Sequence, residues 1–89
     1  MKPPRVTERR IVKRKPGSGG YYGLCHFDKS LVEIDPRQTE EERLDTLLHE
    51  LIHRIDWELK LGLTEEQVAA AGTMQKAVLW SAGYRRVKL

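Results

Sequence analysis

The sequence predicts a single α+β domain in which a small antiparallel β-hairpin packs against two helices. Three observations lead to this class. Two short segments rich in β-branched and aromatic residues, within 21–35, are separated by turn-forming residues. Apolar residues then recur at steps of three and four over 40–61, as on a helix. A second helix-capping signature follows at Thr64. With 89 residues, the chain is long enough for one small domain.

The first 16 residues form a basic arm, with seven Lys and Arg against Glu8 alone, a net charge of +6. The β-branched pair Ile11 and Val12 favours a short edge strand within Val6–Lys13. The Gly-rich stretch that follows interrupts regular structure, so we divide the chain into an arm, 1–16, and a domain, 17–89. Such an arm either serves as a solvated tail or contacts nucleic-acid phosphates, here through Arg5, Arg9, Arg10, Lys13, Arg14 and Lys15.

The hairpin is predicted from two strands, 21–27 and 31–35, joined by a turn at 28–30. Val32 and Ile34 alternate along the second strand, so both side chains should face the core. Pro36 ends this strand because proline cannot donate a hydrogen bond to a neighbouring strand.

Both helices begin with a capping-box pattern. Thr39 is followed three residues on by Glu42, and Thr64 in the same way by Gln67. We predict that the first helix runs to about Leu61, with Gly62 as the residue after its end, and that the second ends near Gly83. The expected buried stripe of the second helix consists of Val68, Ala71, Met74, Val78 and Ala82.

His49, Glu50 and His53 form an HExxH motif in the middle of the first predicted helix. Residues four apart on a helix point in nearly the same direction, so the two imidazoles can bind one zinc ion, each at about 2.0–2.1 Å. Glu50 lies about 100° around the helix from His49. It can therefore act on a zinc-bound water as its general base rather than bind the metal.

A catalytic zinc ion usually has three protein ligands, so one more must come from elsewhere in the chain. A histidine six residues after His53 is absent, since position 59 holds leucine, and the chain has only one further histidine, His26. An acidic residue on the second helix is therefore favoured. We expect Glu65, with Glu66 as the alternative.

Glu65 is preferred because it lies three residues before Val68 and seven before Gly72, on the inward edge of the second helix. Two further acids share the first helix with the histidines. Asp56, three residues after His53, and Asp45, four before His49, could orient an imidazole by hydrogen bonding.

The segments that carry these features resemble small zincin-like proteins of phages and bacteria, related in layout to the SprT-like and ImmA/IrrE-type metallopeptidases. They are 22–28 (YGLCHFD), 32–36 (VEIDP), 44–53 (LDTLLHELIH), 63–68 (LTEEQV) and 79–84 (LWSAGY). The resemblance implies a minimal zincin-like fold, in which a helix after the HExxH helix supplies the third ligand. It also implies one Zn²⁺ ion bound by His49, His53 and a glutamate of the Glu65–Glu66 pair, with Glu50 as the catalytic base.

The sequence therefore predicts a zinc-dependent metallopeptidase acting on a peptide or protein. The alternatives are a non-catalytic zinc-containing binding module and a small nucleic-acid-binding protein that uses the basic arm. A single cysteine, Cys25, excludes an internal disulfide and favours a reducing compartment. No apolar run approaches the roughly 20 residues that cross a bilayer. We expect a cytoplasmic protein without membrane contact, and the sequence leaves its oligomeric state open.

Overall fold

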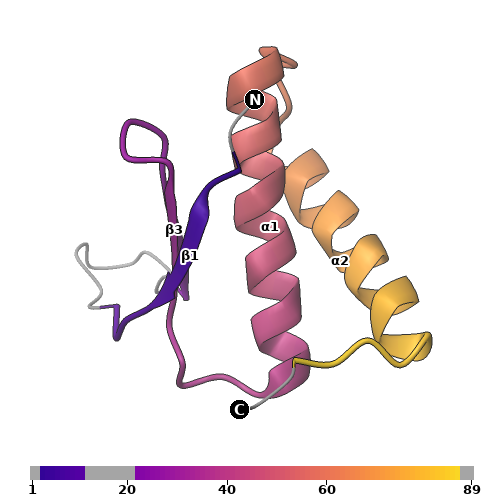
Figure 1. Cartoon of the computed structure of the whole chain (residues 1–89). Helices are drawn as coiled ribbons and strands as arrows, with labels where there is room; N and C mark the ends of the chain where they lie inside the picture. Colours follow the sequence, from indigo (N-terminus) through magenta and orange to yellow (C-terminus); the bar gives the residue numbers. More distant parts are fainter. Residues whose placement is uncertain (1–2, 12–21, 87–89) are drawn as a thin grey trace.

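The computed structural model describes residues 3–11 and 22–86. Within them the chain forms three strands and two helices, which confirms the α+β class. Helix α1 lies between the sheet on one side and α2 on the other (Figure 1). The elements, in chain order, are β1 (Arg5–Glu8), β2 (Gly23–His26), β3 (Leu31–Ile34), α1 (Glu40–Leu59) and α2 (Glu65–Ser81).

The sheet has the order β1-β3-β2, and its central strand supplies two completely buried apolar residues to the core. β2 and β3 form the predicted antiparallel hairpin, with Cys25 opposite Val32. Val32 and Ile34 are completely buried on one face of β3, as the alternation predicts. The buried apolar residues among those described are few: Ile11, Val32, Ile34, Ile52 and Val68.

The edge strand in the basic arm differs from the prediction in position and direction. It spans Arg5–Glu8 rather than Val6–Lys13, and it pairs with β3 in parallel, so the sheet is mixed rather than antiparallel. Val6 lies opposite Val32, and beyond the strand the Arg9 amide donates to the carbonyl of Ile34 at 2.9 Å. Sequence patterns reveal a strand more readily than its partner, because pairing direction depends on the path of the intervening chain.

Helix α1 begins as predicted and ends two residues early. Thr39 and Glu42 form both hydrogen bonds of the capping box. The helix stops at Leu59 because Lys60 adopts a left-handed conformation (φ 53°), which takes the place expected for Gly62. Asp56 forms two hydrogen bonds where the chain leaves the helix. Its carbonyl accepts from the Lys60 amide, and its carboxylate accepts from the Leu63 amide in the loop.

Helix α2 has the predicted capping box at Thr64, but most of the predicted buried stripe is wrong. Val68 is buried, whereas Met74 and Val78 are 71% and 64% exposed, and Ala82 is also exposed. The reason is that, among the described elements, α2 packs only against α1 and does so through the face that carries Val68 and Gly72. Neither α1 nor α2 is both long and apolar enough to span a membrane.

Candidate metal centre

His49 and His53 on α1 meet Glu65 at the start of α2. The Nε2 atom of His49 lies 2.7 Å from one carboxylate oxygen of Glu65, and that of His53 lies 3.0 Å from the other. One donor atom from each residue can be chosen so that all three lie within 4.8 Å of one another. Donors bound to one zinc ion at about 2.0–2.1 Å with tetrahedral angles lie about 3.4 Å apart, so this set fits zinc with small adjustments.

The structure places Glu65, not Glu66, against the two imidazoles. The capping box at Thr64 makes Glu65 the first residue of α2 and holds its backbone. Two turns later the helices approach closely, since a Cβ added to Gly72 would lie 3.3 Å from the backbone nitrogen of His49. This small residue lets α2 run near enough to α1 for the Glu65 side chain to reach both histidines.

Glu50 lies on the side of α1 that faces the sheet and is only 8% exposed. Burial raises the pKa of its carboxyl group; the nearby His53 opposes this shift and Glu65 adds to it. β2 passes very close to this side chain, because a Cβ added to Gly23 would lie 2.9 Å from Cγ of Glu50. Glycine at this position therefore lets the strand lie directly against the predicted base.

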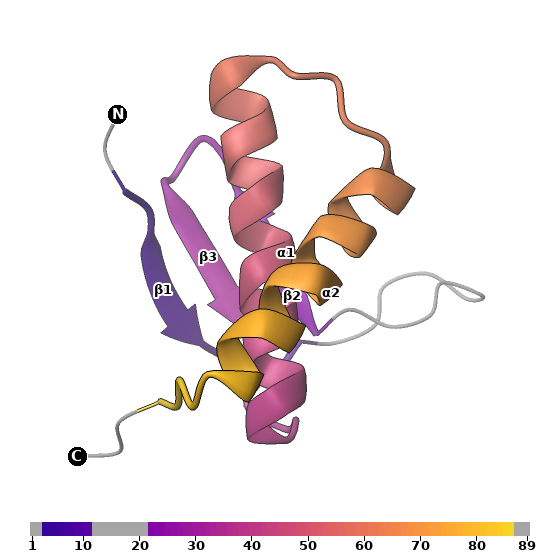
Figure 2. The same ribbon diagram turned by 90° about the vertical axis from the view of Figure 1, so that its right-hand side faces the viewer.

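A cleft of about 530 Å³ opens between the start of β2, α1 and the first half of α2. In Figure 2, α2 lies in front of α1 and the sheet behind it, and both β2 and the beginning of α2 appear to the right of α1. The cleft contains His49, Glu50 and Glu65 together, so the two predicted chemical roles share one space. Its remaining lining residues are Tyr22, Gly23, Gln38, Glu42, Asp45, Thr46, Ala69 and Thr73.

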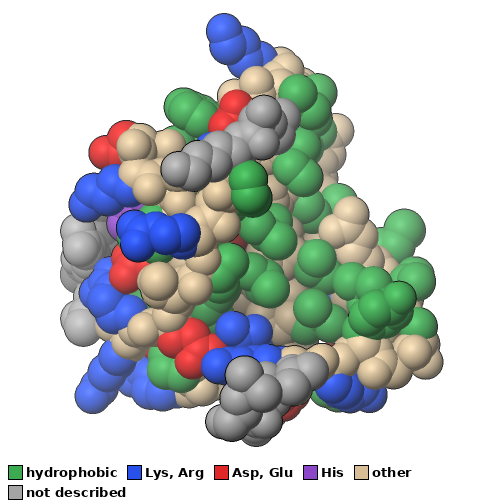
Figure 3. All heavy atoms as spheres, in the orientation of Figure 1, with side chains coloured by type: hydrophobic (Ala, Val, Ile, Leu, Met, Phe, Trp, Pro, Cys, Tyr) green, Lys and Arg blue, Asp and Glu red, His purple; other side chains and the backbone are tan. Residues whose placement is uncertain are grey.

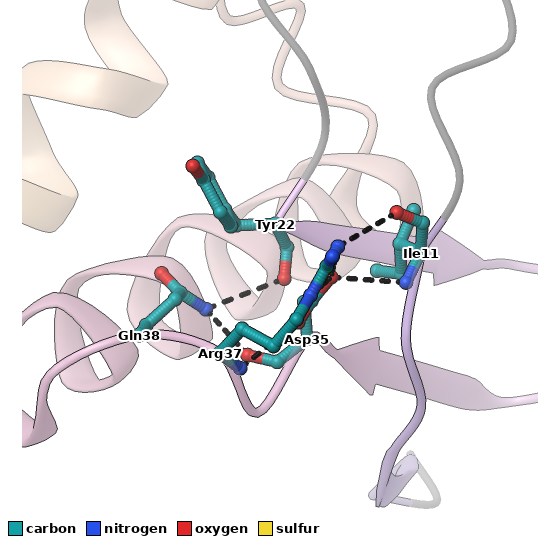
Figure 4. Close-up of polar contacts among 5 residues, drawn as sticks. All are labelled: Ile11, Tyr22, Asp35, Arg37 and Gln38. Atoms are coloured by element: carbon teal, nitrogen blue, oxygen red, sulfur yellow. Dashed lines mark hydrogen bonds and ion pairs between the residues drawn. The ribbon is translucent and has the colours of Figure 1, made fainter.

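One wall of the cleft is held by a buried carboxylate that sequence reasoning missed. Asp35 is completely buried, and it accepts hydrogen bonds from the Arg37 side chain and from the Ile11 amide (Figure 4). The Arg37 guanidinium keeps the pKa of Asp35 well below its usual range. The Asp35 amide donates to the carbonyl of Tyr22, and its carbonyl accepts from Gln38, so the two cleft residues Tyr22 and Gln38 are fixed through it. The position of Asp35, directly after a strand with buried apolar residues, is the sequence signal that could have identified it.

The other acids expected near the histidines lie elsewhere or act differently. Asp45 lines the cleft one turn before His49. Asp56 accepts a hydrogen bond from the Leu63 amide at 3.0 Å. Among the described residues, no hydrogen bond joins Asp56 to His49 or His53, so Asp56 holds the loop before Glu65 rather than an imidazole.

His26 is not part of the centre. Its Nε2 atom lies 2.5 Å from Glu33, which also pairs with Arg9. Glu33 alternates with Val32 and Ile34 along β3, so this cluster lies on the sheet face turned away from α1. Three guanidinium and imidazole contacts hold the pKa of Glu33 at about 2, the Arg9 hydrogen bond most strongly.

Three of the six basic residues predicted to contact nucleic acid lie in the described part of the chain. Arg5 lies in β1, Arg9 pairs with Glu33, and Arg10 is exposed. The rest of that set, Lys13, Arg14 and Lys15, lies outside the described residues. Cys25 is half-buried, and burial raises the pKa of its thiol to about 11, so it is protonated at neutral pH.

Comparison of the chain with protein families, curated proteins and solved structures found no match in any of the three searches. The functional argument therefore depends on the geometry of the site.

Proposed function

We propose that this protein is a zinc-dependent metallopeptidase, with His49, His53 and Glu65 as the metal ligands and Glu50 as the general base. The observation that carries the proposal is the convergence of both imidazole Nε2 atoms on the two carboxylate oxygens of Glu65, at 2.7 and 3.0 Å. Two histidines and a glutamate are the donor set of one well-known class of catalytic zinc sites. A fourth position then remains for water or substrate.

Zinc bound by this set supplies Lewis acidity, which polarises a carbonyl group and lowers the pKa of a water molecule. The task of the chain is to hold a base beside that water. Glu50 follows the first ligand directly and lies about 100° around the helix from it, so its carboxylate enters the same cleft from another direction. Its burial keeps the carboxylate out of bulk water. At this buried position the carboxylate can take a proton from the water molecule and deliver it to the leaving amine.

An extended peptide has a natural place beside β2. Among the described strands β2 pairs only with β3, so its other edge has no described strand partner. The strand begins at Gly23, in the cleft, next to Glu50. A substrate strand added to this edge would have its backbone held by hydrogen bonds while a peptide bond enters the cleft.

The experiment measures zinc content and peptidase activity on the same preparations. Wild-type protein should carry one zinc ion per chain, and His49→Ala should lose it. Glu50→Gln should keep the metal and lose about 10²- to 10⁴-fold in the cleavage rate of a quenched fluorescent peptide library. Glu66→Gln is the matched control, an exposed acid beside the third ligand, and should change neither readout.

The same measurements separate the proposal from its nearest rival. If wild type and Glu50→Gln bind zinc equally and neither cleaves any peptide in the library, the zinc site belongs to a non-catalytic binding module. If wild-type protein binds no zinc, the metal assignment itself is wrong.

A further inference from the structure

The face of α1 opposite the metal centre carries an apolar ridge made of Leu44, Leu47, Leu51 and Ile55. With about 100° between successive residues, Leu51 lies about 200° around the helix from His49. The first three side chains are partly exposed, and Ile55 is 44% exposed. Figure 3 views this face: hydrophobic side chains run over α1 and onto α2, and no histidine is visible in the central region. The steps of three and four residues are those of a helix-packing seam.

A pocket of about 290 Å³ lies at the N-terminal end of the ridge. Leu44 and Leu47 of the ridge share its lining with Trp80 and Tyr84. Sites for drug-sized ligands usually span about 300–1,000 Å³, so this pocket lies just below that range. It is better suited to one or two bulky side chains of a protein partner, of the kind that anchor interfaces.

Three arginines surround this pocket, against two acids. Arg43 and Arg86 both bond to the same carboxylate oxygen of Glu8, each through one nitrogen atom. Arg85 stacks on Trp80, with its guanidinium carbon 3.4 Å from the ring centroid, and donates to the backbone carbonyls of Trp80 and Tyr84. Glu40 is the second acid at the pocket. The rim is thus net positive, and its guanidinium groups have further N–H donors directed by a planar fork that suits carboxylates.

We propose that the ridge and this pocket bind an acidic amphipathic helix of a partner protein. The apolar side of such a helix would lie along the ridge, which extends for about 17 Å between Leu44 and Ile55. One bulky side chain would fill the pocket, and flanking carboxylates would meet Arg43, Arg85 and Arg86. The charge of the rim argues against a second copy of this chain, because two copies would bring like charges together.

The test uses the full-length protein and two synthetic helical peptides of about 16 residues. Both carry leucine at positions 1, 5, 8 and 12; one has glutamate on its flanks and the other lysine. We expect the acidic peptide to bind at least tenfold more tightly than the basic one, measured by fluorescence anisotropy at low salt. The double variant Arg85→Glu/Arg86→Glu should reverse this preference, and Leu47→Asp should weaken the binding of both peptides. Circular dichroism confirms that each variant is folded.

Lys29→Glu is the matched control, since it reverses a charge on an exposed residue of the hairpin turn and should leave the peptide preference unchanged. Glu50→Gln should also leave the peptide preference unchanged, because Glu50 lies in the cleft on another face of α1. The proposal is overturned if neither peptide binds, or if both bind equally. It is also overturned if sedimentation shows a dimer that Leu47→Asp dissociates, or if duplex DNA binds more tightly than the acidic peptide and is lost in the arginine variant.

Discussion

Replacing Gly23 by alanine tests whether the close approach of β2 to α1 is a real constraint on the site. The new Cβ would lie 2.6 Å from Cγ2 of Thr46 and 2.9 Å from Cγ of Glu50. Carbon atoms in contact prefer separations of about 3.5–4.0 Å, so the strand or the side chains must move by about 1 Å. Overpacking of this kind costs about 1–3 kcal/mol. Removing a strand glycine recovers only about 0.5–1 kcal/mol, so the free energy of unfolding should fall by about 0–2.5 kcal/mol, with about 1 kcal/mol as the central value.

Thr46→Ser provides the matched second change. It removes the methyl carbon that is nearest to the new Cβ and keeps the hydroxyl that donates to Gln38 at 2.7 Å. In the Gly23→Ala background it should therefore restore about half of the lost stability, whereas alone it should have a small effect. The coupling between the two substitutions should lie within the range of about 0.5–3 kcal/mol that is usual for residues in contact.

Urea unfolding of the four proteins, followed by circular dichroism, measures these free energies. The reasoning is refuted if Gly23→Ala is as stable as wild type, as strand preference alone would predict, or if Thr46→Ser gives no recovery. The proposed peptidase supplies a second readout. Gly23→Ala should leave the zinc affinity nearly unchanged, since it touches no ligand, and should lower the cleavage rate by displacing Glu50.

Three further predictions concern charged residues. Structural zinc sites have binding free energies of about 10–16 kcal/mol, or about 3 kcal/mol per ligand. Glu65→Gln should therefore weaken zinc binding about 10²-fold, measured by competition with a chelator. The control Glu66→Gln should change the zinc affinity by less than twofold. Because the pKa of Glu33 is lowered from 4.5 to about 2, its contribution to stability is complete above pH 4.5 and is lost as the pH falls towards 2. Glu33→Gln should therefore flatten the pH dependence of the urea midpoint within that window; an unchanged slope contradicts the assignment. Asp56→Ala should cost about 0.5–1.5 kcal/mol through loss of the bond to Leu63 and should also weaken zinc binding, whereas Asp56→Asn, which keeps an acceptor oxygen, should do neither.

Local features of the structure could be predicted well. The capping boxes at Thr39 and Thr64 depend on residues three apart, and both are present. The alternation that buries Val32 and Ile34 is likewise a property of one strand. The expected place of Glu65 on the inward edge of α2 followed from its spacing to Val68, and its contacts with both histidines agree with it.

Long-range features were harder to predict. Met74 and Val78 looked like core residues by periodicity, yet they face away from α1, because an apolar helix can show two candidate faces and only packing selects one. The parallel pairing of β1 and the hydrogen bonds of Ile11 with Asp35 and Arg37 join segments more than 20 residues apart. No local pattern specifies such pairs.

The sequence by itself determined the chemistry available to this protein: an HExxH helix, its start at Thr39, and an acid at the start of the next helix. These depend on helical periodicity and capping, which act over a few residues. Only the tertiary structure decided how the parts meet. The close approaches at Gly23 and Gly72 bring the strand to Glu50 and the second helix to His49, and the apolar ridge on the opposite face of α1 stays partly exposed. Such contacts arise from the packing of whole elements, which residue spacing along one chain segment does not encode.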